Sequence, residues 1–317
     1  MFSLLLTLLL TAAHATQLEG AEVPCPLGGA PVQVFRLISQ DSMGGWDSDG
    51  VGYSTQGQFR NFEVSTCPNH ALALYGRDME LGLSAAQLAL VTPLVDQLEA
   101  RYPNPSALEA WDRHAMAART YEALGRDDWF LAKAWLKAGW TLRDAAVGEM
   151  IGLSGPLLTR QLLLAGEGEL KKELPPSQRK LLLFNMARAA HRGGYGAERD
   201  ALLQQLEAVG ALDDAEQIAL AKLRTAAELE PGLQEQAMRH LAAVVEGEGP
   251  FTYQAHYLLA DLLRRTGRGA LAIAAYEDIA GDRKAPDNLR ALSSYLAAEL
   301  KGERPWEQEQ RTPLTAP

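Results

Sequence analysis

The two cysteines are the residues whose type and spacing first suggest chemistry. Each is followed by proline, in the runs CPLG (25–28) and CPNH (67–70). A structural zinc site usually takes its ligands from paired C-x-x-C knuckles. Here glycine stands at the second thiol position of the first run, and His70 stands at that of the second. Cys25, Cys67 and His70 are therefore candidate zinc ligands, and an aspartate or water would have to complete the set.

A disulfide, free thiols and a metal site are the alternatives for these cysteines. In an oxidising compartment, two lone cysteines more often pair with each other. A Cys25–Cys67 disulfide would stabilise a small, glycine-rich domain by about 4 kcal/mol in the chain-entropy model. The sequence therefore favours a disulfide and no cofactor. Zinc held by Cys25, Cys67 and His70 stays as the alternative.

The first residues, 1–15, match a cleavable secretory signal. A short apolar run precedes the small-x-small sequence that ends at Ala15. The run is too short to span a bilayer, and no later stretch reaches that length. We therefore expect an exported protein, periplasmic or extracellular, with no transmembrane segment in the mature chain.

The charge of the chain narrows the choice of partner. Its formal net charge is −10, and 47% of its residues are hydrophobic. An acidic surface repels phosphate backbones, which argues against nucleic acid. The apolar fraction predicts a packed core in one large or two modest domains.

Composition divides the chain at about residue 83. Residues 20–82 are rich in Gly, Pro, Ser and Asp and contain short alternating segments, which predicts a small head of strands and loops. The run Asp47–Gly50 in this head is typical of a solvated turn. Residues 84–300 are predicted to be helical, and the tail, 301–317, is predicted to be disordered.

The helical part contains hairpins similar to the tetratricopeptide repeat. In the best copy, Ala260 stands where two helices approach closely, Gly267 makes the turn, and Ala272 and Tyr276 pack the second helix back. Weaker copies place small residues at matching positions: Ala118, Gly125 and Ala132 in one, and Ala187 and Gly194 in another. Helical pairs are expected near 176–208, 213–246 and 252–280. Stacked hairpins of this kind predict an α-solenoid.

Motifs of catalysis are missing from the sequence. It has no P-loop, no HExxH and no dinucleotide fingerprint. Its helical histidines are scattered singly, and Glu228 and Glu230 beside Pro231 are predicted to be solvated charges. These observations indicate a protein that is not an enzyme.

Several segments together resemble an uncharacterised bacterial family in which a CPxC…CPxC zinc-ribbon-like head precedes tetratricopeptide-like helices. The resemblance covers the two Cys-Pro segments and the runs 61–69, 134–143 and 262–267. It implies a zinc-ribbon-like head and, in the family, metal bound there. This sequence lacks the second cysteine of each pair.

The expected fold is mainly α: a tetratricopeptide-like α-solenoid behind a small N-terminal strand-and-loop module. The expected function is that of an exported, non-catalytic scaffold that binds a protein or peptide partner. A zinc-binding protein is the alternative, and a hydrolase of envelope polymers is the second alternative. The sequence does not indicate an oligomeric state.

Overall fold

The computed structural model describes residues 16–148, 150, 153–307 and 315–317. Most of these residues lie in helices and the strands are few and short, so the mainly helical class is confirmed. The expected signal segment, 1–15, lies outside the described residues. None of the described helices combines the length and the apolar character needed to cross a membrane.

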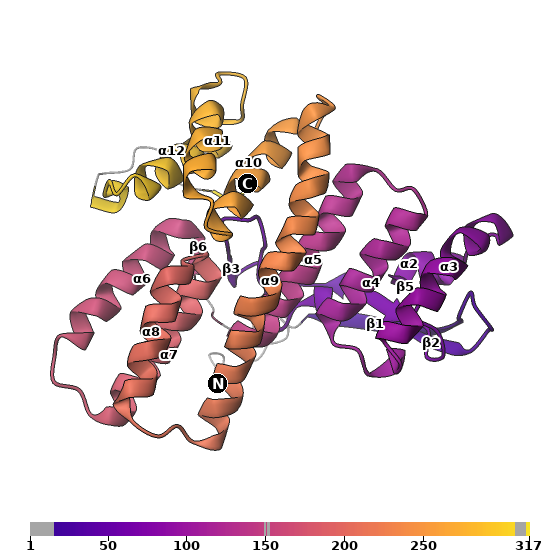
Figure 1. Cartoon of the computed structure of the whole chain (residues 1–317), viewed down its shortest axis with the longest axis horizontal. Coiled ribbons are helices and arrows are strands. Elements are labelled where there is room, and N and C mark those ends of the chain that lie inside the picture. Colours follow the sequence, from indigo (N-terminus) through magenta and orange to yellow (C-terminus); the bar gives the residue numbers. More distant parts are fainter. Residues whose placement is uncertain (1–15, 149, 151–152, 308–314) are drawn as a thin grey trace, which may run out of the picture. The chain divides into compact units, whose positions relative to one another are not determined.

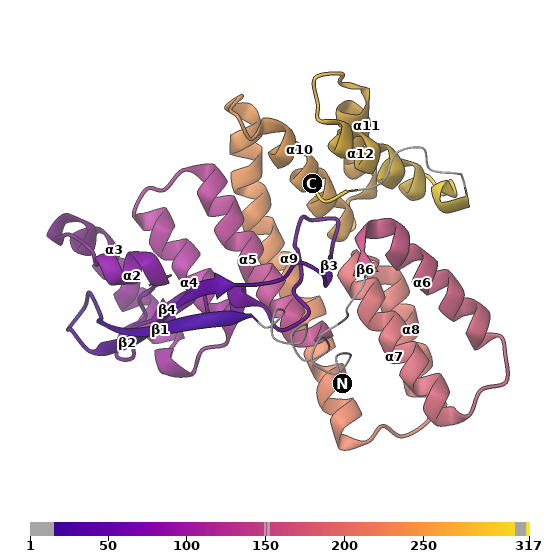
Figure 2. The ribbon, with the colours of Figure 1, turned by 180° about the vertical axis from the view of Figure 1, so that it is seen from behind.

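Contacts between residues divide the chain into two compact units (Figures 1 and 2). Unit 1 takes in residues 1–44 and 53–142, and unit 2 takes in residues 45–52 and 143–317. A short loop of the N-terminal part therefore belongs to the C-terminal unit.

Unit 1 combines two β-hairpins with helices. Its elements are β1 (Gln17–Pro24), β2 (Pro31–Ser39), the 3-10 turn η1 (Phe59–Asn61), β4 (Val64–Thr66), β5 (Ala73–Tyr75), α2 (Gly76–Leu81), α3 (Ala85–Arg101), the turn η2 (Pro105–Ala107), α4 (Ala110–Ala123) and most of α5 (Asp128–Val147). Strand β1 pairs antiparallel with β2, and β4 pairs antiparallel with β5. The β1–β2 hairpin is the longer of the two and the β4–β5 hairpin the shorter, and α2 packs on both (Figure 2).

A disulfide lies in the core of unit 1. Cys25 and Cys67 are bonded to each other and are almost fully buried, among Val34, Leu72 and Met116. The structure thus adopts the first of the alternatives that the sequence left open. The bond ties the turn after β1 to the turn after β4, so it links the two hairpins covalently.

A buried tyrosine links helices α2 and α4 of unit 1 to its strands. The hydroxyl of Tyr121 on α4 donates to Asp78 of α2 at 2.6 Å and accepts the backbone N–H of Tyr75 at 2.9 Å. Because α4 packs on β4 and β5 in this way, the contacts do not divide the chain at residues 82–84. The expected head and the first helices form one unit.

Unit 2 is a series of helices with one minimal two-stranded sheet. Its elements are β3 (Gly45–Trp46), the end of α5, β6 (Leu153–Ser154), α6 (Gly155–Leu170), α7 (Pro176–Gly193), α8 (Gly196–Val209), α9 (Asp214–Glu246), α10 (Thr252–Arg265), α11 (Gly269–Gly281), α12 (Asp287–Leu300) and the turn η3 (Pro305–Glu307). Consecutive helices pack against each other from α6 to α8 and from α9 to α12. This packing is compatible with a solenoid.

Helix α9 corrects the expected pair of helices at 213–246. It is one helix of 33 residues that passes through Pro231. Asp213 and Glu216 form a capping box at its start. Its buried positions keep helical spacing on both sides of the proline, from Leu220 to Leu241, so packing of a continuous stripe outweighs the one hydrogen bond that proline removes.

Order extends beyond the expected end of the helical part. Pro305–Glu307 forms a 3-10 turn in which Pro305 is buried, although the sequence predicts disorder from residue 301. Residues 308–314 lie outside the described part of the chain.

Candidate functional site

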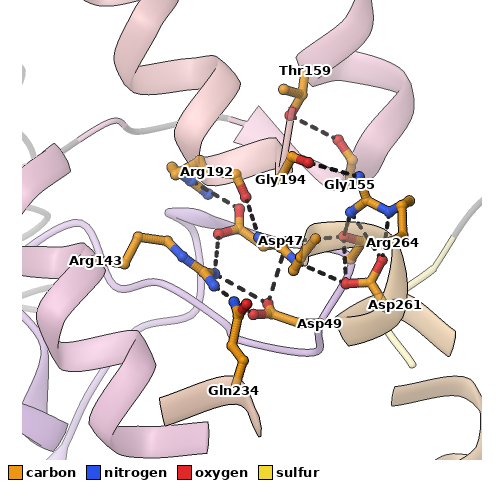
Figure 3. A network of polar contacts seen from close by, with 12 residues as sticks. Asp47, Asp49, Arg143, Gly155, Thr159, Arg192, Gly194, Gln234, Asp261 and Arg264 are labelled. Carbon is orange, nitrogen blue, oxygen red and sulfur yellow. Dashed lines mark hydrogen bonds and ion pairs between the residues drawn. The ribbon is translucent and has the colours of Figure 1, made fainter. Parts of the chain in front are cut away.

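The most concentrated chemistry in the described residues is a buried cluster of charges in unit 2. Four carboxylates and four guanidinium groups, on side chains that are at most 5% exposed, come from the 45–52 loop and from helices α5, α7, α9 and α10 (Figure 3). They are Asp47, Asp49, Glu230, Asp261, Arg143, Arg192, Arg264 and Arg265. We call them the charge cluster. Its formal charges cancel, which burial requires of ionised groups.

The loop that carries Asp47 and Asp49 is held by backbone contacts. Strand β3 pairs parallel with β6, and the N–H of Asp47 donates to Val51 at 2.9 Å. Gly45 has φ +90, and a Cβ there would stand 1.9 Å from the carbonyl oxygen of Leu153. Only glycine allows this approach, which sets the direction in which the loop enters the helices.

Arg143, near the end of α5, contacts three of the four carboxylates. Its guanidinium lies 3.1 Å from Asp47 and 2.7 Å from Asp49, and it also donates to Glu230 of α9. Arg192 of α7 holds the other oxygen of Asp47 at 2.8 Å. The two aspartates of the loop thus bind α5 and α7 directly, and α9 joins them through the contact of Arg143 with Glu230.

The second half of the cluster lies on α10. Asp261 accepts from Arg264 and Arg265 on its own helix, at 2.9 and 2.8 Å. Both arginines also donate to the hydroxyl of Ser48, each at 2.9 Å, and that hydroxyl donates to Asp261 at 3.0 Å. Tyr276 of α11 completes the set by donating to Asp261 at 2.8 Å. Figure 3 shows Asp261 and Arg264 of this half together with Asp47 and Asp49 of the loop.

The electrostatics show how firmly the carboxylates are held. Burial alone would raise the pKa of Glu230, but the charge of Arg143 and contacts with His191 outweigh burial and lower that pKa to about 2. Burial likewise opposes ionisation of Asp261, yet Arg264 and Arg265 keep its pKa below the usual range. Both groups are therefore poor proton acceptors at neutral pH, and the cluster is suited to hold helices in place.

This pKa predicts a loss of stability in acid. A carboxylate with a lowered folded pKa stabilises the protein above its unfolded pKa, and that contribution is lost as pH falls from 4.5 to about 2. For Glu230 the loss is about 3 kcal/mol, at about 1.36 kcal/mol per pH unit. Urea unfolding at pH 7, 4, 3 and 2 measures it, because only part of the loss is reached at pH 3. Glu230→Gln, which carries no titrating proton, should show a flatter profile, and parallel profiles for the two proteins would contradict the assignment.

A small cavity of about 30 Å³ adjoins the cluster beside His191. Arg199 can only donate, so its contact with Nδ1 of His191 at 3.2 Å makes that nitrogen the acceptor. The proton then sits on Nε2, which lies 3.2 Å from Glu230 without good hydrogen-bond geometry. The space suffices for about one water molecule.

No family model, no curated protein and no solved structure matches the chain.

The residues first considered for zinc do not form a ligand set in the structure. The sulfur atoms of Cys25 and Cys67 are joined in the disulfide, and Nδ1 of His70 lies 2.9 Å from Glu99. Across the described part of the chain, no three His, Cys, Asp or Glu side chains are placed to hold a metal ion.

The residues named for repeat packing lie at helix contacts and turns. The small residues and the tyrosine are fully buried: Ala118, Ala132, Ala187, Ala260, Ala272 and Tyr276. The glycines that end helices or turns have positive φ: Gly125, Gly194 and Gly267. Gly194 has a second reason to be glycine, because a Cβ would stand 2.5 Å from Cγ of Arg265.

Two expectations about charged residues are wrong. Asp47 and Asp49 are 3% and 1% exposed, so the run is no solvated turn. Glu230 is 4% exposed because α9 turns it toward Arg143, whereas Glu228 is exposed as expected. In both places, pairing with buried arginines from distant segments overrides the local preference for water.

A signal for the cluster is present in the sequence. An arginine stands two residues before the turn glycine in two hairpins, as Arg192 before Gly194 and Arg265 before Gly267. Two arginines at matching helix ends, together with the Asp-x-Asp run at residues 47–49, indicate that the arginines pair with the same acidic loop.

Proposed function

We propose that this protein is an exported, non-catalytic interaction module whose unit 2 helices bind a protein or peptide partner. The observation that carries the proposal is a groove of about 330 Å³ on α6, α7 and α8, which lie side by side in Figure 1. We call it the α6–α8 groove. It is lined by Leu163, Glu167, Leu170, Lys171, Met186, Glu198, Ala201, Leu202 and Gln205.

The lining suits a peptide or helix more than a small polar substrate. Apolar side chains from three helices form its floor, and charged groups of both signs, such as Glu167 and Lys171, stand at its margin. Exposed Leu158, Leu164 and Leu181 on α6 and α7 add apolar surface to the same helices. An apolar centre with a polar rim is the usual anatomy of a protein interface.

The charge cluster supports a binding role because Arg192 anchors α7, one of the three helices of the groove, and so gives the groove a rigid base. The arginines of the cluster form ion pairs with the four carboxylates, and these ion pairs hold the helices and the 45–52 loop together. A rigid base lowers the entropy lost on binding. The zinc-binding alternative would need the thiolates of Cys25 and Cys67, and the disulfide occupies both.

The finer parts of the proposal rest on the sequence. Export rests on the signal-like residues 1–15, and a disulfide is typical of an oxidising compartment. The tetratricopeptide-like solenoid and the family resemblance rest on the hairpin pattern and the Cys-Pro runs.

Site-specific photocrosslinking tests this function. A benzoylphenylalanine at Gln205, in the groove, should capture a defined partner from the exported fraction of the source cells. The matched control places the same group at Ala208, which is exposed on α8 outside the groove. Adducts that are equal at both positions, or missing from every cell fraction, would contradict the proposal.

A further inference from the structure

A second groove lies in unit 1, and its chemistry differs from that of the α6–α8 groove. It measures about 400 Å³ and is formed by β2, β4, the η2 turn and the start of α4. We call it the β2–β4 groove. It is lined by Pro31, Val32, Gln33, Phe35, Phe62, Val64, Ser65, Thr66, Pro68, Pro105, Ser106 and Arg113.

The charge of this groove is opposite to that of the chain. Arg113 is its one charged lining residue, in a protein whose formal net charge is −10. Two N–H groups of Arg113 donate to the backbone carbonyls of Leu108 and Asn61, at 3.2 and 2.7 Å. Among the described residues, no carboxylate forms an ion pair with Arg113, although the charge of Glu109 acts on it and opposes the lowering of its pKa by burial. Its guanidinium is therefore fixed in place and has no carboxylate bound to it.

Two polar atoms of the lining residues also lack partners. Nε of Arg113 and Oγ1 of Thr66 are buried, and within the described part of the chain neither makes a hydrogen bond. The hydroxyls of Ser65 and Ser106, by contrast, donate to Gln33 and Asn104 at 2.8 Å. A buried donor without an acceptor destabilises the folded protein, and a bound acceptor would remove that cost.

The apolar part of the groove fits side chains of a polypeptide. Phe35 and Phe62 meet edge to face with centroids 5.5 Å apart, and Phe62 is 44% exposed. Three prolines, Pro31, Pro68 and Pro105, line the same hollow. Rigid apolar walls of this kind bind extended segments at little entropic cost.

We propose that the β2–β4 groove binds an extended peptide segment of a partner protein, in which an Asp or Glu side chain stands beside an apolar one. The carboxylate pairs with Arg113, the hydroxyl of Thr66 donates to the peptide, and the apolar side chain packs on Phe35 and Phe62. The site is separate from the α6–α8 groove, so either can be lost without the other.

Peptide titration with a matched pair of probes tests this proposal. The probes are the fluorescein-labelled peptides Ala-Pro-Asp-Phe-Ala-Pro and Ala-Pro-Asn-Phe-Ala-Pro, with blocked ends, titrated against the full chain by anisotropy. The Asp peptide should bind about tenfold or more tightly than the Asn peptide, the usual scale for a charge-assisted hydrogen bond. In Arg113→Gln this preference should vanish, and Arg77→Gln should preserve it, because Arg77 is exposed on α2 outside the groove.

A second variant separates binding from folding. Thr66→Val should keep or raise the midpoint of thermal unfolding, because it removes an unpartnered buried hydroxyl. The same variant should bind the Asp peptide more weakly than the wild type does. The proposal would be overturned if the wild type bound the two peptides equally well or bound neither. It would also be overturned if Arg77→Gln lost the preference for the Asp peptide as fully as Arg113→Gln does. Displacement by sodium acetate as effective as displacement by unlabelled Asp peptide would also overturn it, because the groove would then recognise a free carboxylate only.

Discussion

Replacing Arg143 with methionine is expected to lower the free energy of unfolding by about 3–5 kcal/mol, the usual cost of leaving buried carboxylates without their partner. Arg143 is 1% exposed and contacts Asp47, Asp49 and Glu230. Its loss leaves these three carboxylates with less positive charge nearby, while methionine keeps most of the apolar volume. Urea unfolding at pH 7, followed by far-ultraviolet circular dichroism, measures the change.

The matched control is Arg224→Met on α9. Arg224 pairs with Glu207, but both side chains are about half exposed. An exposed pair contributes about 0–1 kcal/mol, so this variant should unfold nearly as the wild type does. If the two variants lost similar amounts of unfolding free energy, burial of Arg143 would not explain its effect on stability, and the prediction would be wrong.

Removing the disulfide should have the second large effect. The Cys25→Ala, Cys67→Ala double variant is expected to lose about 4 kcal/mol, because the closed loop no longer restricts the unfolded chain. The two sulfurs lie in the core of unit 1, so the loss should appear in the unfolding of its strands and of α4. Urea unfolding of the double variant against the oxidised wild type measures it.

Reduction provides an independent control. Wild type treated with a phosphine reductant should unfold as the double variant does, and the oxidised protein should show no free thiol under denaturing conditions. Two reactive thiols together with stoichiometric zinc in the purified protein would contradict the disulfide and restore the metal-binding alternative.

Local sequence signals predicted the helical part of the fold well where they act over a few residues. Gly194 ends a hairpin helix and Gly267 lies in a helix-to-helix turn, as the repeat pattern predicts. The same rules failed at Pro231, which resembles a stop signal but lies inside α9. Burial of a stripe on both sides of the proline is a tertiary effect, and no local rule contains it.

Local sequence rules could not predict the charge cluster, because its residues are far apart in the chain. Arg192 and Asp47 are 145 residues apart in sequence, and Arg265 and Ser48 are 217 apart. Asp and Ser next to glycine predict a solvated turn whenever the neighbouring residues alone are considered. The sequence does not predict the β2–β4 groove for a similar reason, since Arg113 and Thr66 line one groove only after the hairpins fold on α4.

Binding of the captured partner to two variants of helix α8 tests the central claim most directly. Ala201 lines the α6–α8 groove and Ala208 does not, and both are exposed alanines on the same helix. We expect Ala201→Arg to weaken binding at least about tenfold in calorimetric titration, while Ala208→Arg leaves it within about twofold. Equal affinities for the two variants would contradict the account, because the groove would then take no part in binding.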